Sequence, residues 1–429
     1  MLTFIRNRLH KTNNISKSTY VWNAINATAS ACQSTVITMV MTRTNGVNDV
    51  GVFAIAYAVA NLMLYVGQYG FRRYQASDVN EKYKYGEYVG LRIITCAAML
   101  IASVAYGIFG ICFKSYGAEK FIIVIIACLV KCIQAFVDVI HGRMQQLGRL
   151  DVAAKASASR IILSTVAYVV ALIVTKDLIL STAIWLAVAL AVFSLTSLNA
   201  SRDYGGLNVV MNISAFKGLL IEGFPLFTSY FLSMYIGNAP KYAIDACLTD
   251  DVQAYFNYVF MPAFAVRLLC NFIFNPIITE YANVWANKDV KKFIKLIKKQ
   301  SLVVLGMTMA GVLVALTIGI PVLGILFGVA LGDYKSTLVV VMIGGGCLAY
   351  VTFFTTVLTV IRHQASFLIS YLIVALGAFL FSKCIVVNFG INGAATLYAV
   401  LMGVLGIVLA ITSIYHIKKD SAGWKEDKA

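Results

Sequence analysis

Apolar blocks of about twenty residues follow one another along the chain, separated by short polar stretches. As a helix, one such block crosses the roughly 30 Å hydrocarbon core of a bilayer. A soluble core would instead show apolar and polar positions alternating with the period of a helix or a strand. The pattern predicts twelve membrane spans, at 20–41, 50–70, 89–113, 121–141, 157–175, 179–200, 219–237, 252–280, 301–322, 338–360, 368–385 and 393–414.

Two features of these blocks add detail. The block at 302–331 is too long for one span, and we expect Pro321 to divide it into a span and an interfacial piece. The spans at 20–41, 219–237 and 252–280 carry more Asn, Ser, Thr and Gln than the others. Because polar groups are costly in lipid, these three helices are expected to face a partner or a water-filled cavity.

Composition and charge agree with this picture. The 429 residues are 60% hydrophobic and 13% charged, outside the range of ordinary soluble domains. The net charge of +16 is not a nucleic-acid signature, because 26 of the 35 Lys and Arg residues fall on the side of the N-terminus. The positive-inside rule then places both termini in the cytoplasm.

A weak internal repeat predicts two halves. The motif NDVGVF at 48–53 resembles DDVQAY at 250–255, and a basic loop follows the next span in both places. Six spans in each half would make parallel repeats, an arrangement that suits a two-lobed transporter. We therefore expect an N-terminal lobe at 1–205 and a C-terminal lobe at 206–429.

Signals of enzymatic chemistry are missing from the sequence. It contains no P-loop motif, no CxxC pair, no His pair at metal-ligand spacing, and no loop long enough for a catalytic domain. We expect no catalytic residues, no metal site and no cofactor.

Charged residues inside the spans are the candidate functional residues. Arg267 lies near the middle of the span at 252–280, and a guanidinium there suits recognition of a phosphate. Lys131 and Asp138 are seven residues apart on one face of the span at 121–141. A structural pair within the bundle is the alternative for these two.

Three further charges lie near the ends of spans. Lys241 and Asp245 are four residues apart at the end of the span at 219–237, where an interfacial ion pair of little energetic value is the alternative. Arg43 ends the first span at a similar level, and it would otherwise extend toward the lipid headgroups.

Three soft motifs carry a resemblance to a known family. The stretches TNGVNDVGVFA at 44–54, QQLGRL at 145–150 and FGINGAA at 389–395, together with the twelve predicted spans, resemble the bacterial polysaccharide exporters of the Wzx type. These O-antigen and capsule repeat-unit flippases belong to the MOP superfamily, with the MATE multidrug exporters and the lipid II flippase. The resemblance covers nearly the whole chain, although its motifs are not invariant.

The resemblance implies a V-shaped pair of six-helix lobes in the bacterial cytoplasmic membrane. Its implied function is to turn an undecaprenyl-pyrophosphate-linked oligosaccharide to the outer leaflet by alternating access, beside membrane lipids, a polysaccharide polymerase and a chain-length regulator. The implied substrate site would contain these residues: Arg267 at the pyrophosphate, with Lys131, Arg43, Asn271 and Lys241. Asp138 and Asp245 are the candidates for ion coupling.

The chain departs from the lipid II flippase in having no arginine within its second span. Lipid II is therefore a less favoured substrate than another lipid-linked sugar. The main alternative function is a cation-coupled multidrug or metabolite antiporter of the MATE type, which would need acidic groups in its cavity. A major-facilitator transporter and a membrane-embedded polymerase fit the loops less well.

Overall fold

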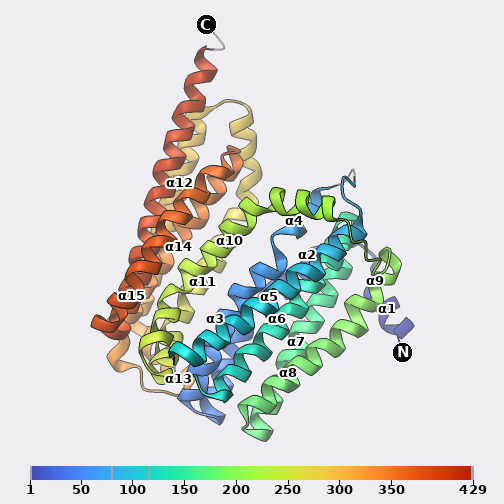
Figure 1. Ribbon diagram of the computed structural model, residues 1–429. Coiled ribbons are helices and arrows are strands. Elements are labelled where there is room, and N and C mark those ends of the chain that lie inside the picture. The colour runs from blue at the N-terminus through green and yellow to red at the C-terminus, as the bar shows by residue number, and fades with distance from the viewer. Residues whose placement is uncertain (1, 79–80, 115, 427–429) are drawn as a thin grey trace. The chain divides into compact units, whose positions relative to one another are not determined.

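The computed structural model describes residues 2–78, 81–114 and 116–426, and every regular element in these ranges is a helix (Figure 1). The chain divides into two compact units, Met1–Phe231 and Leu232–Ala429. Their boundary lies inside one long helix, α10 (Ile213–Cys247). The lobe boundary at 205/206 stays a prediction.

The N-terminal unit is a bundle of helices around α3 and α6. Its elements before α10 are α1 (Leu2–His10), α2 (Ile15–Thr44), α3 (Val47–Gln68), α4 (Phe71–Ser77), α5 (Tyr85–Lys114), α6 (Ala118–Gln146), α7 (Leu150–Thr175), α8 (Leu178–Phe193), η1 (Ser194–Leu198), α9 (Asn199–Ser201) and η2 (Arg202–Tyr204). Helix α6 contacts α3, α5 and α8, and α2 packs along α7. In the apolar 18-residue stretch of α3, 78% of the residues are buried, whereas the share in α5 is 28%. Helix α3 is therefore a central helix of this bundle.

The C-terminal unit contains the rest of α10 and the later helices. These are α11 (Asp250–Ala286), α12 (Val290–Val314), η3 (Ala315–Gly319), α13 (Ile320–Phe327), η4 (Gly332–Tyr334), α14 (Lys335–Val360) and α15 (Gln364–Glu426). Gly390 interrupts α15 with φ 57° and ψ −139°. Ser366 lies beside His416 and Gly393 lies close to Ile385, so the two parts of α15 run antiparallel as a hairpin.

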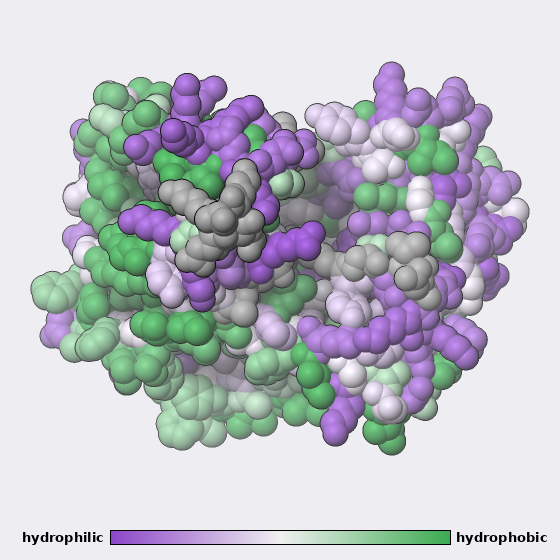
Figure 2. Space-filling model, turned by 90° about the horizontal axis from the view of Figure 1, so that it is seen from above, coloured by the Kyte–Doolittle hydropathy of each residue, from purple (hydrophilic) through white to green (hydrophobic). Residues whose placement is uncertain are grey.

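The predicted polytopic all-α membrane fold is confirmed. Nine helical stretches of the described chain are long and apolar enough to cross a membrane. The predicted spans at 20–41 and 252–280 lie in α2 and α11, which are not among the nine, and the last two predicted spans share α15. Figure 2 views the end where the C-terminus lies and shows many hydrophilic residues there. The count of twelve and the cytoplasmic termini stay predictions.

Pro321 does not divide its block as expected. A π-helical turn, η3, precedes it, and helical geometry continues through α13 to Phe327. A proline lacks the N–H that would donate in an α-helix, and its ring collides with the preceding turn. The wider π-turn accommodates that irregularity without ending the helix, so Val290–Phe327 forms one helical stretch.

Polar contacts connect the first part of α10 to α4 and to the loop that follows it. Glu222 on α10 accepts hydrogen bonds from Lys82 Nζ at 2.6 Å, from Tyr83 Oη at 3.2 Å and from Tyr74 Oη. The hydrogen bond to Glu222 raises the pKa of Tyr74 to about 12, and the same carboxylate raises the pKa of Lys82. The first part of α10 is thereby tied to the N-terminal unit.

Helix α1 is held by the bundle through its last carbonyl groups. Lys155 on α7 donates to the carbonyl oxygens of Leu9 and Lys11, both at 3.0 Å. Arg149 donates to the carbonyl oxygen of His10 at 3.2 Å. Cations at a helix C-terminus satisfy carbonyls that have no partner within the helix. Asp151 is fully buried and pairs with both cations, so their charge is partly compensated.

Close approach of three helices depends on Gly67, near the end of α3. A Cβ atom at this position would lie 2.8 Å from Ala135 Cβ on α6 and 2.8 Å from Met99 Sδ on α5. Gly67→Ala should therefore destabilise the protein by about 1–3 kcal/mol through overpacking. The measurement is the thermal unfolding midpoint of the purified protein in one detergent.

Gly306→Ala on α12 is the matched control, because no other atom lies within 4 Å of its added Cβ. This variant should unfold at or slightly above the temperature of the parent, since alanine favours helices over glycine. Equal midpoints for the two variants would contradict the close approach at Gly67.

Candidate functional site

The N-terminal unit encloses two groups of charged side chains, and both involve α6. This helix carries Lys131 near its middle and Asp138 two turns later. Their exposed fractions are 5% and 7%. Both side chains are buried, but they have different partners and do not form a pair with each other.

Lys131 is part of a polar chain through the middle of the bundle. Its Nζ lies 3.4 Å from Tyr57 Oη on α3 and 4.5 Å from the centroid of the Tyr57 ring. Tyr57 Oη lies 3.4 Å from Gln33 Oε1 on α2, and Gln33 Nε2 donates to Thr165 Oγ1 on α7 at 2.8 Å. Within the described part of the chain, no carboxylate pairs with Lys131. Its charge is stabilised by an aromatic face and a phenol.

Asp138 is shared by two arginines. Its Oδ2 lies 3.3 Å from Arg92 Nη2 on α5, and its Oδ1 lies 3.5 Å from Arg72 Nη1 on α4. Arg92 is completely buried, and it also donates to the carbonyl oxygen of Gly67, which accepts from Thr95 Oγ1 as well. One carboxylate therefore compensates two guanidinium groups.

A third arginine adds to the positive charge of this region. Arg160 on α7 is 4% exposed, and its Nε has no hydrogen-bond partner among the described residues. Arg160 and Arg72 both act electrostatically on the buried ring of His141, whose Nε2 lies 3.0 Å from Ser197 Oγ. Cations thus outnumber carboxylates among the buried side chains of this region.

Arg92 and Arg160 were missed as buried residues by the sequence analysis. Each lies within the first turns of a predicted span, at 89–113 and 157–175, close to the basic residues that flank these spans. Helices α5 and α7 begin four and seven residues before those spans, so the two arginines lie inside helices. Their position inside the apolar blocks was the available signal.

The described contacts of these two groups involve none of the other predicted site residues. Arg43 is exposed in the last turn of α2. Lys241 and Asp245 in the C-terminal unit are both 6% exposed, which does not fit an interfacial ion pair in water. Lys241 Nζ donates to Asn257 Oδ1 at 2.7 Å and lies 4.9 Å from the centroid of the Phe260 ring. The side chains of Arg267 and Asn271 on α11 lie outside the described residues.

The described residues contain no cluster of three His, Cys, Asp or Glu side chains that could hold a metal ion. The chemistry of the site is instead that of buried ammonium and guanidinium groups. In a low-dielectric interior, such groups attract an anion strongly once it replaces their missing partners.

Comparisons with known proteins identify the fold. No protein-family profile matches the sequence, and no curated protein is similar to it. Among solved structures, the lipid II flippase MurJ in an inward closed conformation matches with a TM-score of 0.68 and 14% identity, over 94% of this chain and 90% of its own. An inward-facing MATE family multidrug transporter of the MOP superfamily matches with a TM-score of 0.62 and 15% identity, over 97% of this chain and 98% of its own.

A variant of the Vibrio cholerae MATE transporter VcmN is also similar, with a TM-score of 0.59 and 10% identity over 98% of each chain. At these identities the matches show the fold alone. The chain has the fold shared by MATE transporters and MurJ.

The Asp138 group gives a stability prediction. Asp138→Asn leaves the fully buried Arg92 without its carboxylate and should destabilise the protein by about 3–5 kcal/mol. Glu81→Gln removes the half-exposed carboxylate that pairs with Arg143 at 2.6 Å, and it should cost about 0–1 kcal/mol. Thermal unfolding of both variants in detergent measures the difference.

The double variant Asp138→Asn, Arg92→Met should recover part of the stability that Asp138→Asn loses, because it removes the stranded charge. If the double variant is less stable than Asp138→Asn by the full cost of a second independent substitution, the proposed pairing is wrong.

Proposed function

We propose that this protein is a MOP-superfamily transporter that moves a lipid-linked, pyrophosphate-bearing oligosaccharide across the bacterial cytoplasmic membrane, and that it is not an enzyme. The fold that it shares with MurJ and the MATE transporters supports the transporter class. The observation that carries the choice of an anionic substrate is Lys131, a buried ammonium with no described carboxylate partner.

Buried charge of one sign has a direct physical consequence. A pyrophosphate cannot cross hydrocarbon without groups that replace its hydration. Among the described buried side chains of the N-terminal unit, four cations exceed three carboxylates: Arg92, Lys131, Lys155 and Arg160 against Glu87, Asp138 and Asp151. Such an excess lowers the free energy of an anion and raises that of a cationic drug.

In this proposal Arg267 binds the pyrophosphate, and Lys131, Arg43 and Lys241 assist it. Asn271 would contact the sugars. Alternating access would carry the substrate from the cytoplasmic to the outer leaflet, for surface-polysaccharide synthesis. The two carboxylates proposed for ion coupling differ in surroundings: Asp138 already pairs with two arginines, whereas Asp245 is buried in the C-terminal unit.

A cation-coupled antiporter of the MATE type is the second candidate, because MATE transporters share this fold as fully as MurJ does. An organic cation would need a carboxylate that the protein does not already use. Asp138 is occupied by Arg92 and Arg72, which favours the flippase.

Lys131 provides a test that separates function from stability. Lys131→Met removes a buried charge with no carboxylate partner, so it should leave stability unchanged or raise it. The same variant should lower export at least tenfold, whereas Lys131→Arg should retain part of it. Export is measured as surface polysaccharide in cells of the native host whose own copy of the gene is deleted, at matched protein levels.

Lys335→Met is the matched control, because Lys335 is exposed at the start of α14 and should not affect export. Wild-type export by Lys131→Met would exclude a role for this lysine in the substrate path.

Arg267 is tested separately in the same cells. Arg267→Ala should abolish export, and Arg267→Lys should keep a measurable part, because an ammonium still offers charge but not the bidentate fork. Full export by both variants, at normal protein levels, would contradict the proposed pyrophosphate contact.

A further inference from the structure

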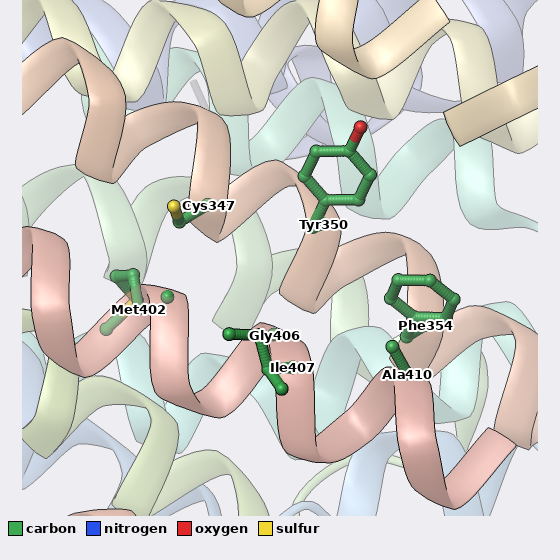
Figure 3. A pocket seen from close by; sticks show the side chains of 8 residues that line it. Cys347, Tyr350, Phe354, Met402, Gly406, Ile407 and Ala410 are labelled. Carbon is green, nitrogen blue, oxygen red and sulfur yellow. The ribbon is translucent and has the colours of Figure 1, made fainter. Parts of the chain in front are cut away.

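A groove between α14 and α15 lies on the C-terminal unit. Its volume is about 220 Å³. Cys347, Tyr350 and Phe354 of α14 line one side, and Met402, Gly406 and Ala410 of α15 line the other (Figure 3). The single hydroxyl among them, on Tyr350, donates to the carbonyl oxygen of Ser301 at 2.7 Å. The groove therefore offers hydrocarbon and sulfur surface to its occupant.

Glycine on the α15 side leaves space in the groove unfilled. The atoms nearest to a Cβ added at Gly406 would be Cys347 O and Tyr350 Cβ, both at 3.7 Å, an ordinary van der Waals distance. A side chain could therefore fit at this position, and its absence leaves the groove open. Exposed apolar side chains lie near it, with Val404, Ile407 and Ile411 at 45%, 62% and 61% exposed.

Helix α14 and the part of α15 that follows Gly390 run parallel beside the groove. Cys347 lies near Gly403, Tyr350 near Gly406, and Phe354 near Ala410 along the two linings. The same register continues beyond the groove, where the His363 ring stacks on His416 at 3.8 Å and His363 Nε2 lies 3.0 Å from Asp420 Oδ2. Helix α14 ends at Val360, whereas α15 continues to Glu426, so Arg362 after α14 lies level with Lys418 on α15, about 12 Å beyond Phe354 and Ala410 at 1.5 Å per residue.

Three exposed cations lie at about this level of the two helices. They are Arg362, which follows α14, and Lys418 and Lys419 on α15. Among the described residues none of the three makes an ion pair, and the nearby carboxylate of Asp420 is held by His363. The apolar groove and, about 12 Å farther along the two helices, these cations match a lipid with a hydrocarbon tail and an anionic headgroup.

We propose that this groove and the three cations form a binding site for an anionic membrane phospholipid. One acyl chain would lie in the groove against Cys347, Phe354 and Gly406, and the phosphate would be bound by Arg362, Lys418 and Lys419. Charge complementarity at these cations favours an anionic over a zwitterionic headgroup. Basic pockets between membrane helices bind anionic lipid headgroups in this way.

The test uses the full-length protein in detergent, titrated with phosphatidylglycerol or with phosphatidylcholine of the same acyl chains. Native mass spectrometry counts the lipids that remain bound. The wild-type protein should retain phosphatidylglycerol at least fivefold better than phosphatidylcholine. Equal retention of the two lipids would overturn the proposal.

Two sets of variants separate the tail from the headgroup. Gly406→Leu fills the groove, and the triple variant Arg362→Gly, Lys418→Gln, Lys419→Gln removes the cations. Arg362 has φ 62°, a conformation that glycine adopts without strain, so the triple variant should not unfold at lower temperature for that reason. Each set should lower phosphatidylglycerol retention at least fivefold.

Matched controls use the same substitutions elsewhere in the unit. Gly377→Leu is placed on α15 where no atom lies within 4 Å of an added Cβ, and Lys295→Gln, Lys298→Gln, Lys299→Gln removes three exposed cations of α12. Both controls should retain phosphatidylglycerol as the wild type does. If they lose as much lipid as the groove variants, or if the groove variants lose none, the site is wrong. Tighter retention of undecaprenyl phosphate than of phosphatidylglycerol would overturn the phospholipid as occupant.

Discussion

The N-terminal unit depends on the buried carboxylate of Asp138, because it compensates the charge of a fully buried arginine, Arg92. Arg92 is completely enclosed, and a guanidinium in such a place is tolerated only with a charged partner and further hydrogen bonds. Asp138 supplies the charge, and the carbonyl oxygen of Gly67 supplies the second acceptor. That carbonyl is in reach because Gly67 lets α3, α5 and α6 approach closely. Packing and charge compensation therefore depend on each other.

The compensation is incomplete, and in our proposal the uncompensated cations bind the anionic substrate. Arg72 shares Asp138, Arg160 lies buried nearby, and Lys131 meets only an aromatic ring and a phenol. A protein selected for stability alone would do better with apolar side chains at these positions. Retained buried cations are explained most simply by an anion that visits them. The shared fold does not decide this, because proteins with the same fold include both MATE multidrug transporters and MurJ.

The sequence predicted the helices well because lipid imposes one rule on every span. Each apolar block must form its own backbone hydrogen bonds, so block length alone locates the helices. The sequence failed where tertiary packing decides. Pro321 continues a helix because a π-turn precedes it, and Arg92 is buried because Gly67 of α3 and Asp138 of α6 pack against it. The spacing of Lys131 and Asp138 predicts that they share one face of the helix, but it does not predict their partners on α3, α4 and α5.

The most direct measurement is transport by the purified protein in liposomes. Two substrates are compared, a fluorescent undecaprenyl-pyrophosphate-linked sugar and a fluorescent organic cation, the latter with an imposed proton or sodium gradient. We expect the protein to move the lipid-linked sugar between leaflets and not to move the cation. Gradient-driven movement of the cation without movement of the lipid-linked sugar would contradict it.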